Sequence, residues 1–164
     1  MNTSLSEGPG EPQARRLESV SEQLSSLLRQ SEIAQRLRAR PGENEWSVMQ
    51  VLAHLVEMIP YWLGHCQTLA AADAPPQFGR TQESPERLAG VARGETRSLD
   101  QLMSELGDEV QAAARAIRRM TPDERDRRGI HLKRGAMSVA EVIEMYIVAH
   151  AEEHLAQVRA TLRV

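Results

Sequence analysis

The chain has 164 residues, of which 41% are hydrophobic and 26% charged, a size and composition typical of one globular domain with its own core. Aromatic residues make up only 3%, which argues against a β-sandwich, because strands are enriched in aromatic and β-branched residues. The net charge of -3 does not favour nucleic acid or an anionic membrane as a partner.

The N-terminal residues 1–14 are rich in Gly, Pro, Ser and Glu, and we expect a flexible tail there. No basic start is followed by an apolar run, so a secretory signal is not expected. No apolar stretch approaches the roughly 20 residues that a membrane-spanning helix needs. Cys66 is the single cysteine, which excludes an internal disulfide and favours a reducing compartment. We therefore expect a cytoplasmic protein.

Two helices are predicted in the first half of the chain. The first runs from Arg15 to Ala39, where apolar residues recur at helical spacing until the Pro- and Gly-containing segment "RPGENEW" ends it. The second starts at Ser47, a suitable N-cap, and continues through "VMQVLAHLVEMIPYWLGHCQTLAAA". Pro60 is expected to kink or split this helix.

Two more helices are predicted in the second half. A long connection follows residue 72, in which Ser84 and Pro85 favour a short helix. The third long helix is expected from Thr96 to Met120, and Thr121 then caps a short new turn. The last helix starts at Ser138, with Glu141 completing a capping box, and runs almost to the C-terminus. No strand is predicted, so the fold class is all-α, a four-helix bundle formed by residues 15–164.

Three histidines form a candidate metal site. His150 and His154 are four residues apart and can therefore point to the same side of the last helix. His54 lies in the second helix, and ligands on facing helices of a bundle converge in its core. Three imidazoles would bind zinc or nickel and leave a coordination position open, as catalytic sites do. The alternative, three ordinary surface or core histidines, stays open at this point.

Other polar residues are candidates for the pocket around this site. Glu57 and Glu153 are placed to accept the second N–H of a metal-bound histidine, or they are solvated helix carboxylates. Tyr146 offers a hydroxyl to a ligand or packs at the edge of the core. His131 precedes the last helix and can reach the mouth of the site, or it is a solvated loop residue.

Further reactive or charged residues are assigned less specific roles. His65 is expected at the surface, and Cys66 is expected to be buried and inert. An arginine-rich stretch, residues 115–134, is either a mixed-charge surface or a binding surface for an anionic thiol. Its acidic residues and the lack of interleaved aromatic residues argue against nucleic-acid binding.

Two segments resemble the DinB-like family of damage-inducible proteins: "WSV" followed by "VLAHL" over residues 46–55, and "MTP…GIH…GAMSVAEVI…HAEEHLAQV" over residues 120–158. The resemblance implies a four-helix bundle, commonly a homodimer. It also implies a divalent metal bound by His54, His150 and His154, usually zinc or nickel, with iron or manganese conceivable. Many relatives have an acidic residue where this chain has Ala151, so a role for that carboxylate does not carry over.

The resemblance also suggests activities. Family members of known activity are thiol-dependent transferases that use bacillithiol or mycothiol, and many others are described as metal-dependent hydrolases. The leading hypothesis is a metal-dependent thiol S-transferase that acts on a small electrophile in detoxification or stress response. The alternatives are a hydrolase with Glu57, Glu153 or His131 as general base, and a non-catalytic metal-binding dimer.

Overall fold

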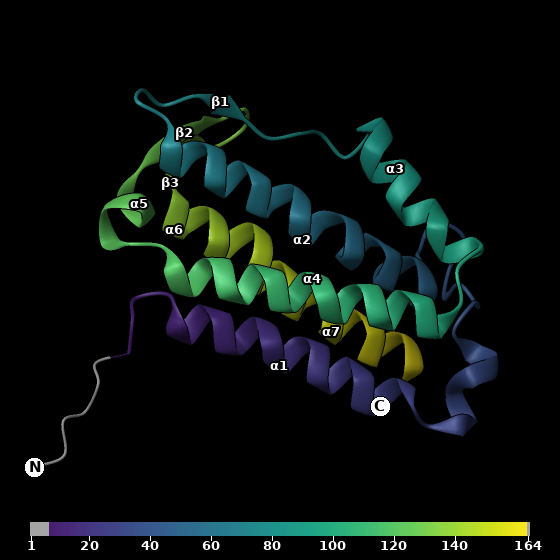
Figure 1. Ribbon diagram of the computed structural model, residues 1–164. Coiled ribbons are helices and arrows are strands. Elements are labelled where there is room, and N and C mark those ends of the chain that lie inside the picture. Colours follow the sequence, from purple (N-terminus) through teal and green to yellow (C-terminus); the bar gives the residue numbers. More distant parts are fainter. Residues whose placement is uncertain (1–6, 164) are drawn as a thin grey trace, which may run out of the picture.

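Four long helical segments lie side by side in the computed structural model, which describes residues 7–163 (Figure 1). They are α1 (Glu11–Leu28), α2 (Val48–Ala71), α4 (Leu99–Arg119) and a C-terminal segment. This last segment consists of α6 (Val139–Val142), one π-helical stretch (Ile143–Val148) and α7 (Ala149–Leu162). Both α1 and α2 pack against α4 and α7. The predicted all-α four-helix bundle is confirmed.

Local side-chain caps define where the helices begin. At the start of α2, the Ser47 hydroxyl accepts the backbone N–H of Gln50 at 3.2 Å, and the Gln50 side chain accepts the N–H of Ser47 at 3.0 Å. The same reciprocal pair joins Ser138 and Glu141 before α6. These capping boxes satisfy N–H groups that have no partner in the first helical turn, and both predicted starts are confirmed.

The first helix differs from its predicted bounds. It begins at Glu11 with a proline in its first turn, and Ala14 is fully buried. The predicted flexible tail, residues 1–14, is therefore too long by the first helical turn, and its residues 1–6 lie outside the described residues. The helix ends at Leu28, and a 3₁₀ turn (Ser31–Arg36) forms the rest of the segment that was expected to be α-helical.

Pro60 does not split α2, which continues past it to Ala71. The residues around the proline, among them Ile59 and Trp62, are buried. Packing of both halves of the helix offsets the hydrogen bond that a proline removes from a helix interior.

A small three-stranded sheet lies at one end of the bundle, where no strand was predicted (Figure 1). Its strands are β1 (Gln77–Phe78), β2 (Arg128–His131) and β3 (Gly135–Ser138). β1 runs parallel to β2, with Phe78 opposite His131, and β2 runs antiparallel to β3. Gly135 has a φ of 75°, which suits the end of a short hairpin loop. The strands are too short for a period-two pattern, so the prediction missed them.

Two short helices complete the chain. α3 (Pro85–Ala92) starts at the predicted Ser84–Pro85 pair, packs on α2 and is followed by a 3₁₀ turn (Arg93–Glu95). α5 (Pro122–Asp126) starts at the predicted Thr121 cap. Glycines allow close packing near α3: a Cβ at Gly94 would lie 2.6 Å from the Cα of Gln50.

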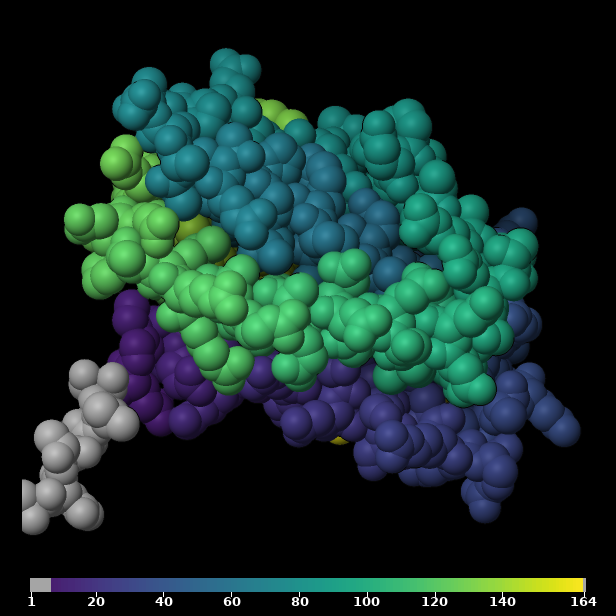
Figure 2. Space-filling model, viewed as in Figure 1, coloured from purple at the N-terminus to yellow at the C-terminus, as the bar shows by residue number. Residues whose placement is uncertain are grey.

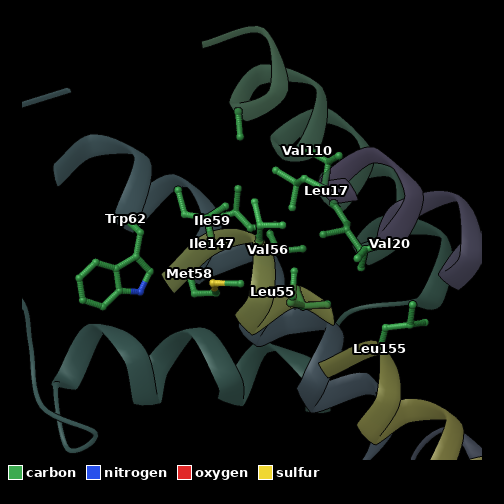
Figure 3. Packing of buried hydrophobic residues seen from close by; sticks show 14 of the residues in the cluster. Leu17, Val20, Leu55, Val56, Met58, Ile59, Trp62, Val110, Ile147 and Leu155 are labelled. Carbon is green, nitrogen blue, oxygen red and sulfur yellow. The ribbon is translucent and has the colours of Figure 1, made fainter. Parts of the chain in front are cut away.

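The core consists mainly of aliphatic side chains from all four long segments. Figure 3 shows Leu17 and Val20 of α1 near Val110 of α4, with residues of α2 and Ile147 of the π-helical stretch at the centre and the Trp62 ring at the edge. In the space-filling view α4 crosses the middle of the front face, between α2 above and α1 below, and little of the yellow C-terminal helix is visible (Figure 2). Within residues 7–163, no helix has the length and apolar character needed to cross a membrane.

Candidate metal centre

His54, His150 and His154 converge at the interface of α2 and α7. The Nε2 atom of His150 lies 3.3 Å from that of His54 and 3.0 Å from that of His154. One ring nitrogen from each residue lies within 4.8 Å of the others. Nitrogens bound at roughly 2.0–2.1 Å to one tetrahedral ion lie roughly 3.3–3.4 Å apart. The His54–His150 distance matches this spacing, and the three nitrogens are close enough together to share a single metal ion.

The other ring nitrogen of each histidine faces a possible acceptor. His154 Nδ1 lies 2.8 Å from the Gln157 side-chain oxygen. His54 Nδ1 lies 3.7 Å from Glu57, and His150 Nδ1 lies 3.6 Å from Glu153. An Nδ1 that donates its proton to an oxygen leaves the lone pair of Nε2 free for a metal. A neutral imidazole has only one N–H, so hydrogen bonds among the three Nε2 atoms cannot satisfy all of them. The residues fit a three-histidine metal site.

Burial keeps these histidines neutral. It lowers the pKa of His54 to about 2 and that of His154 to about 4, with the neighbouring histidines adding to both shifts. Burial also lowers the pKa of His150. Trp46, just before α2, shields the cluster, with its ring 5.0 Å from that of His54. A neutral imidazole is the form that binds a metal, so all three can act as ligands at neutral pH.

A cleft of about 190 Å³ opens beside the cluster, lined in part by His54 and His150. Tyr146, in the π-helical stretch, lines it and stacks between Trp62 and His131, with ring centroids 4.3 and 5.0 Å away. A π-helical turn holds more residues than an α-helical turn, so this stretch changes the direction of every later side chain relative to α6. A role of the Tyr146 hydroxyl toward a ligand stays a prediction.

All the aromatic residues of this aromatic-poor chain lie around the site. The sequence has two tryptophans, two tyrosines and one phenylalanine. Trp46 contacts the histidine cluster, and the other four join His65 and His131 in one network of ring contacts; they are Tyr61, Trp62, Phe78 and Tyr146. The network forms a rigid apolar wall beside the histidines.

His131 is buried at the end of β2 and lines the cleft, rather than lying in a solvated loop. Its Nδ1 accepts the backbone N–H groups of Lys133 and Arg134, each at 3.2 Å. The neutral ring therefore carries its proton on Nε2, which is buried without a partner in the described structure. His131 is thus a hydrogen-bond donor toward its surroundings, and this tautomer cannot act as a base through Nε2.

The two candidate carboxylates have different surroundings. Both oxygens of Glu57 are bound by the guanidinium of Arg80, in a pair whose side chains are only 12% and 9% exposed. Glu153 is 74% exposed on the surface of α7. Neither residue lines the cleft, although each lies close to the outer nitrogen of one histidine.

The cationic residues of the cleft are mostly not those that the sequence suggested. Part of the arginine-rich stretch is used elsewhere: Arg118 bonds Glu11 and Glu18 of α1, and Arg125 bonds Gln13. Of that stretch, only Lys133 and His131 line the cleft. Arg80 and Arg87 also line it and come from the long connection after α2. Nothing in their spacing distinguishes them in the sequence.

The remaining candidates lie outside the cluster. Cys66 is fully buried in α2, and burial raises the pKa of its thiol to about 12, so the thiolate is strongly disfavoured. His65 is partly buried against Tyr61 and Phe78 rather than at the open surface. Neither contributes to the convergence of the three histidines.

Comparison with known proteins agrees with this fold. A model of the DinB superfamily matches residues 16–158. Among solved structures, YfiT from Bacillus subtilis has a TM-score of 0.78 at 15% identity, over 99% of this chain and 91% of that one. YfiT is described as "a probable metal-dependent hydrolase with an unusual four-helix bundle topology". No curated protein matches the sequence.

Proposed function

The chain belongs to the DinB superfamily, and on that premise we propose that it is a metal-dependent thiol S-transferase. We propose that His54, His150 and His154 bind one divalent metal ion, zinc or nickel, with iron or manganese as alternatives. The observation that carries the proposal is the convergence of three Nε2 atoms from α2 and α7 beside an open cleft. The role of the protein would be to detoxify small electrophiles in the cytoplasm.

The bound metal would lower the pKa of a coordinated thiol or water and so provide a nucleophile at neutral pH. The chain supplies three neutral imidazoles. Gln157 orients that of His154 through its outer nitrogen, whereas Glu57 and Glu153 lie 3.7 and 3.6 Å from the outer nitrogens of His54 and His150, beyond hydrogen-bond distance. The aromatic wall of Trp62 and Tyr146 excludes water from one side of the cleft. The His131 ring, which accepts two backbone N–H groups at Nδ1, is fixed as part of the wall of the cleft.

The surroundings of the candidate bases favour thiol transfer over hydrolysis. Glu57 is engaged by Arg80, Glu153 is mostly exposed, and His131 carries its proton on Nε2. Among the described residues that line the cleft there is no carboxylate. A low-molecular-weight thiol such as bacillithiol or mycothiol brings its own nucleophile and needs no protein base once it is ionised.

Hydrolysis remains a second candidate, because the structurally similar YfiT is described as a probable metal-dependent hydrolase. The same three histidines would serve that reaction. The third hypothesis, a metal-binding dimer without catalysis, predicts no cleft beside the metal, and the 190 Å³ cleft speaks against it. The homodimer itself stays a prediction.

The first test is the metal content of protein purified without a His tag. We expect about one metal ion per chain in the wild type, as for a single three-histidine site, and little in His54→Ala or His150→Ala. His65→Ala is the matched control, because this histidine lies outside the cluster, and it should keep its metal. A wild type that binds neither zinc nor nickel would contradict the proposal.

The second test separates the two reactions. Metal-loaded protein is mixed with a chromogenic aryl halide, with and without bacillithiol or mycothiol, and separately with a chromogenic ester. Faster loss of the halide only when thiol and metal are both present supports the transferase. Ester hydrolysis that needs metal but no thiol would replace it with the hydrolase. In that case, changing Glu57, Glu153 and His131 together tests for a protein base.

A further inference from the structure

The cleft beside the histidines is lined by three cationic side chains. Arg80, Arg87 and Lys133 border it, and among residues 7–163 no carboxylate does. A divalent ion on the neutral histidines would add two more positive charges. So many positive charges in one cleft repel one another, and an anionic ligand would relieve that repulsion.

One of the three cations already has a partner. Arg80 binds both oxygens of Glu57, and both side chains are largely buried. The pair is close to neutral as seen from the cleft. The charge of Arg80 is therefore already balanced without an anionic ligand, and the pair engages Glu57, which does not line the cleft.

Arg87 has no such partner. It is partly buried on α3, its guanidinium lies 5.0 Å from the centre of the Trp46 ring, and one nitrogen donates to the Gln82 carbonyl at 2.9 Å. No carboxylate lies within 4.0 Å of it in the described structure. A partly desolvated guanidinium without a carboxylate is costly, and its remaining N–H groups suit a planar or tetrahedral anion.

The other polar groups in this part of the cleft are also donors. Lys133, in the β2–β3 loop, is exposed and has no ion pair within the described chain. The buried Nε2–H of His131 lacks a partner. Its proton position follows from the two backbone N–H groups at Nδ1. The Nε2 nitrogen is itself shielded from solvent and lies beside Gly79, so the donors that a ligand in the cleft can reach are Arg87 and Lys133.

We propose that the cleft recognises a substrate or cosubstrate that carries a carboxylate or phosphate group, and that Arg87 is the main residue binding this anionic group. Lys133, which also lines the cleft, contributes a second positive charge to the binding of this group. The inference rests on the proposed function in one respect: it places the reacting group at the metal. Binding of the anionic group itself depends on Arg87 and not on the metal.

The test measures anion binding by intrinsic fluorescence, because Trp46 contacts Arg87 and Trp62 lines the cleft. Succinate, inorganic phosphate and neutral succinamide are titrated at constant ionic strength into zinc-loaded protein and into protein stripped of metal with EDTA. The variants are Arg87→Gln, Arg87→Lys and Arg115→Gln. Arg115 is exposed on α4, so its substitution is the matched control for the lost charge.

We expect succinate or phosphate, but not succinamide, to bind both forms of the wild type. Loss of a charge-assisted pair should weaken binding about tenfold in Arg87→Gln. Arg87→Lys should fall between this variant and the wild type, and Arg115→Gln should bind as the wild type does. Tighter binding of succinate would identify the group as a carboxylate, and tighter binding of phosphate would identify it as a phosphate. Circular dichroism of each variant verifies that its helices are intact.

Equal anion binding by wild type and both Arg87 variants, or equal binding of succinamide and succinate, would overturn the inference. Failure of this inference can be told apart from failure of the proposed function. Anion binding that depends on Arg87 in a protein unable to bind metal would refute only the metal-dependent activity. A protein that binds metal at the histidines but shows no Arg87-dependent anion binding would refute only the inference.

Discussion

The Nε2 atoms of His54 and His150 lie 3.3 Å apart, although 96 residues separate them in the chain. His54 is carried by α2 and His150 by α7, two helices that pack against each other in the bundle. The contact is therefore a product of helix packing, which also holds His154 one turn away. Helix packing thus limits the freedom of all three side chains, which reduces the ordering entropy that opposes metal binding.

Gln157 should matter for metal affinity although it does not belong to the ligand set. Its side-chain oxygen lies 2.8 Å from His154 Nδ1 and orients that ring. We expect Gln157→Leu to weaken zinc binding by about 10–100-fold, measured by competition with a chromophoric chelator. Gln111→Leu, at an exposed position of α4, is the control. Unchanged affinity in Gln157→Leu would show that this hydrogen bond does not support the ligand.

The metal-free protein should lose stability as the pH falls below about 6.5, the usual pKa of an unfolded histidine. In the folded state burial lowers the pKa of His54 to about 2 and that of His154 to about 4. Below pH 6.5 the unfolded chain therefore takes up protons that the folded chain does not, which favours unfolding. Each such histidine contributes a slope of about 1.4 kcal/mol per pH unit.

Urea denaturation in EDTA between pH 6.5 and 5 measures this effect. His54→Gln should show a shallower fall in unfolding free energy than the wild type, because one of the buried titrating groups is gone. Equal slopes in the two proteins would mean that His54 takes up its proton over the same pH range in the folded and the unfolded state.

Two glycines should respond in opposite ways to alanine. A Cβ at Gly94 would lie 2.6 Å from the Cα of Gln50 and from the Met49 carbonyl oxygen, which are backbone atoms of α2 and cannot move aside. Gly94→Ala should therefore destabilise the fold by about 1–3 kcal/mol. Gly107 lies inside α4 with no atom within 4 Å of its added Cβ. Gly107→Ala should stabilise the protein by about 0.5–1 kcal/mol, and chemical denaturation measures both. A Gly94→Ala variant as stable as the wild type would contradict the close packing.

The thiol of Cys66 should not react in the native protein. It is fully buried, and burial raises its pKa to about 12. A chromogenic disulfide reagent at pH 8 should therefore detect no native thiol, whereas protein unfolded in guanidinium should show the single cysteine. Rapid reaction of the folded protein would mean that Cys66 is accessible and is itself a candidate nucleophile.

The positions of the helix starts could be predicted from the sequence because their causes are local. Ser47 and Ser138 cap their helices with a residue only three positions away, so the pattern is visible in a short window. The same holds for His150 and His154, whose spacing of four places them on one side of α7. The start of α1 was missed because its first turn contains Glu11 and Pro12, which lie in a segment of loop-like composition.

The cleft could not be predicted in this way. Its cations Arg80 and Arg87 come from a connection without periodicity, and β1 is two residues long and pairs with β2 far along the chain. The π-helical stretch that positions Tyr146 departs from the 3.6-residue period on which helix prediction depends. The arginine-rich stretch that the sequence emphasised bonds mainly to α1 and to surface groups.

The sequence by itself thus determined the all-α class, the main helix starts, the buried Cys66 and the pair of histidines on α7. Each of these follows from residue type and from spacing within a few turns. Only the tertiary structure decided that His54 meets that pair and that the His131 ring accepts at Nδ1. It also decided that Arg80 and Arg87 line the cleft, where Lys133 is the one cation of the arginine-rich stretch among the described lining residues. Such contacts depend on how helices pack against each other and where the loops lie. The spacing of residues within a short stretch of sequence does not specify either.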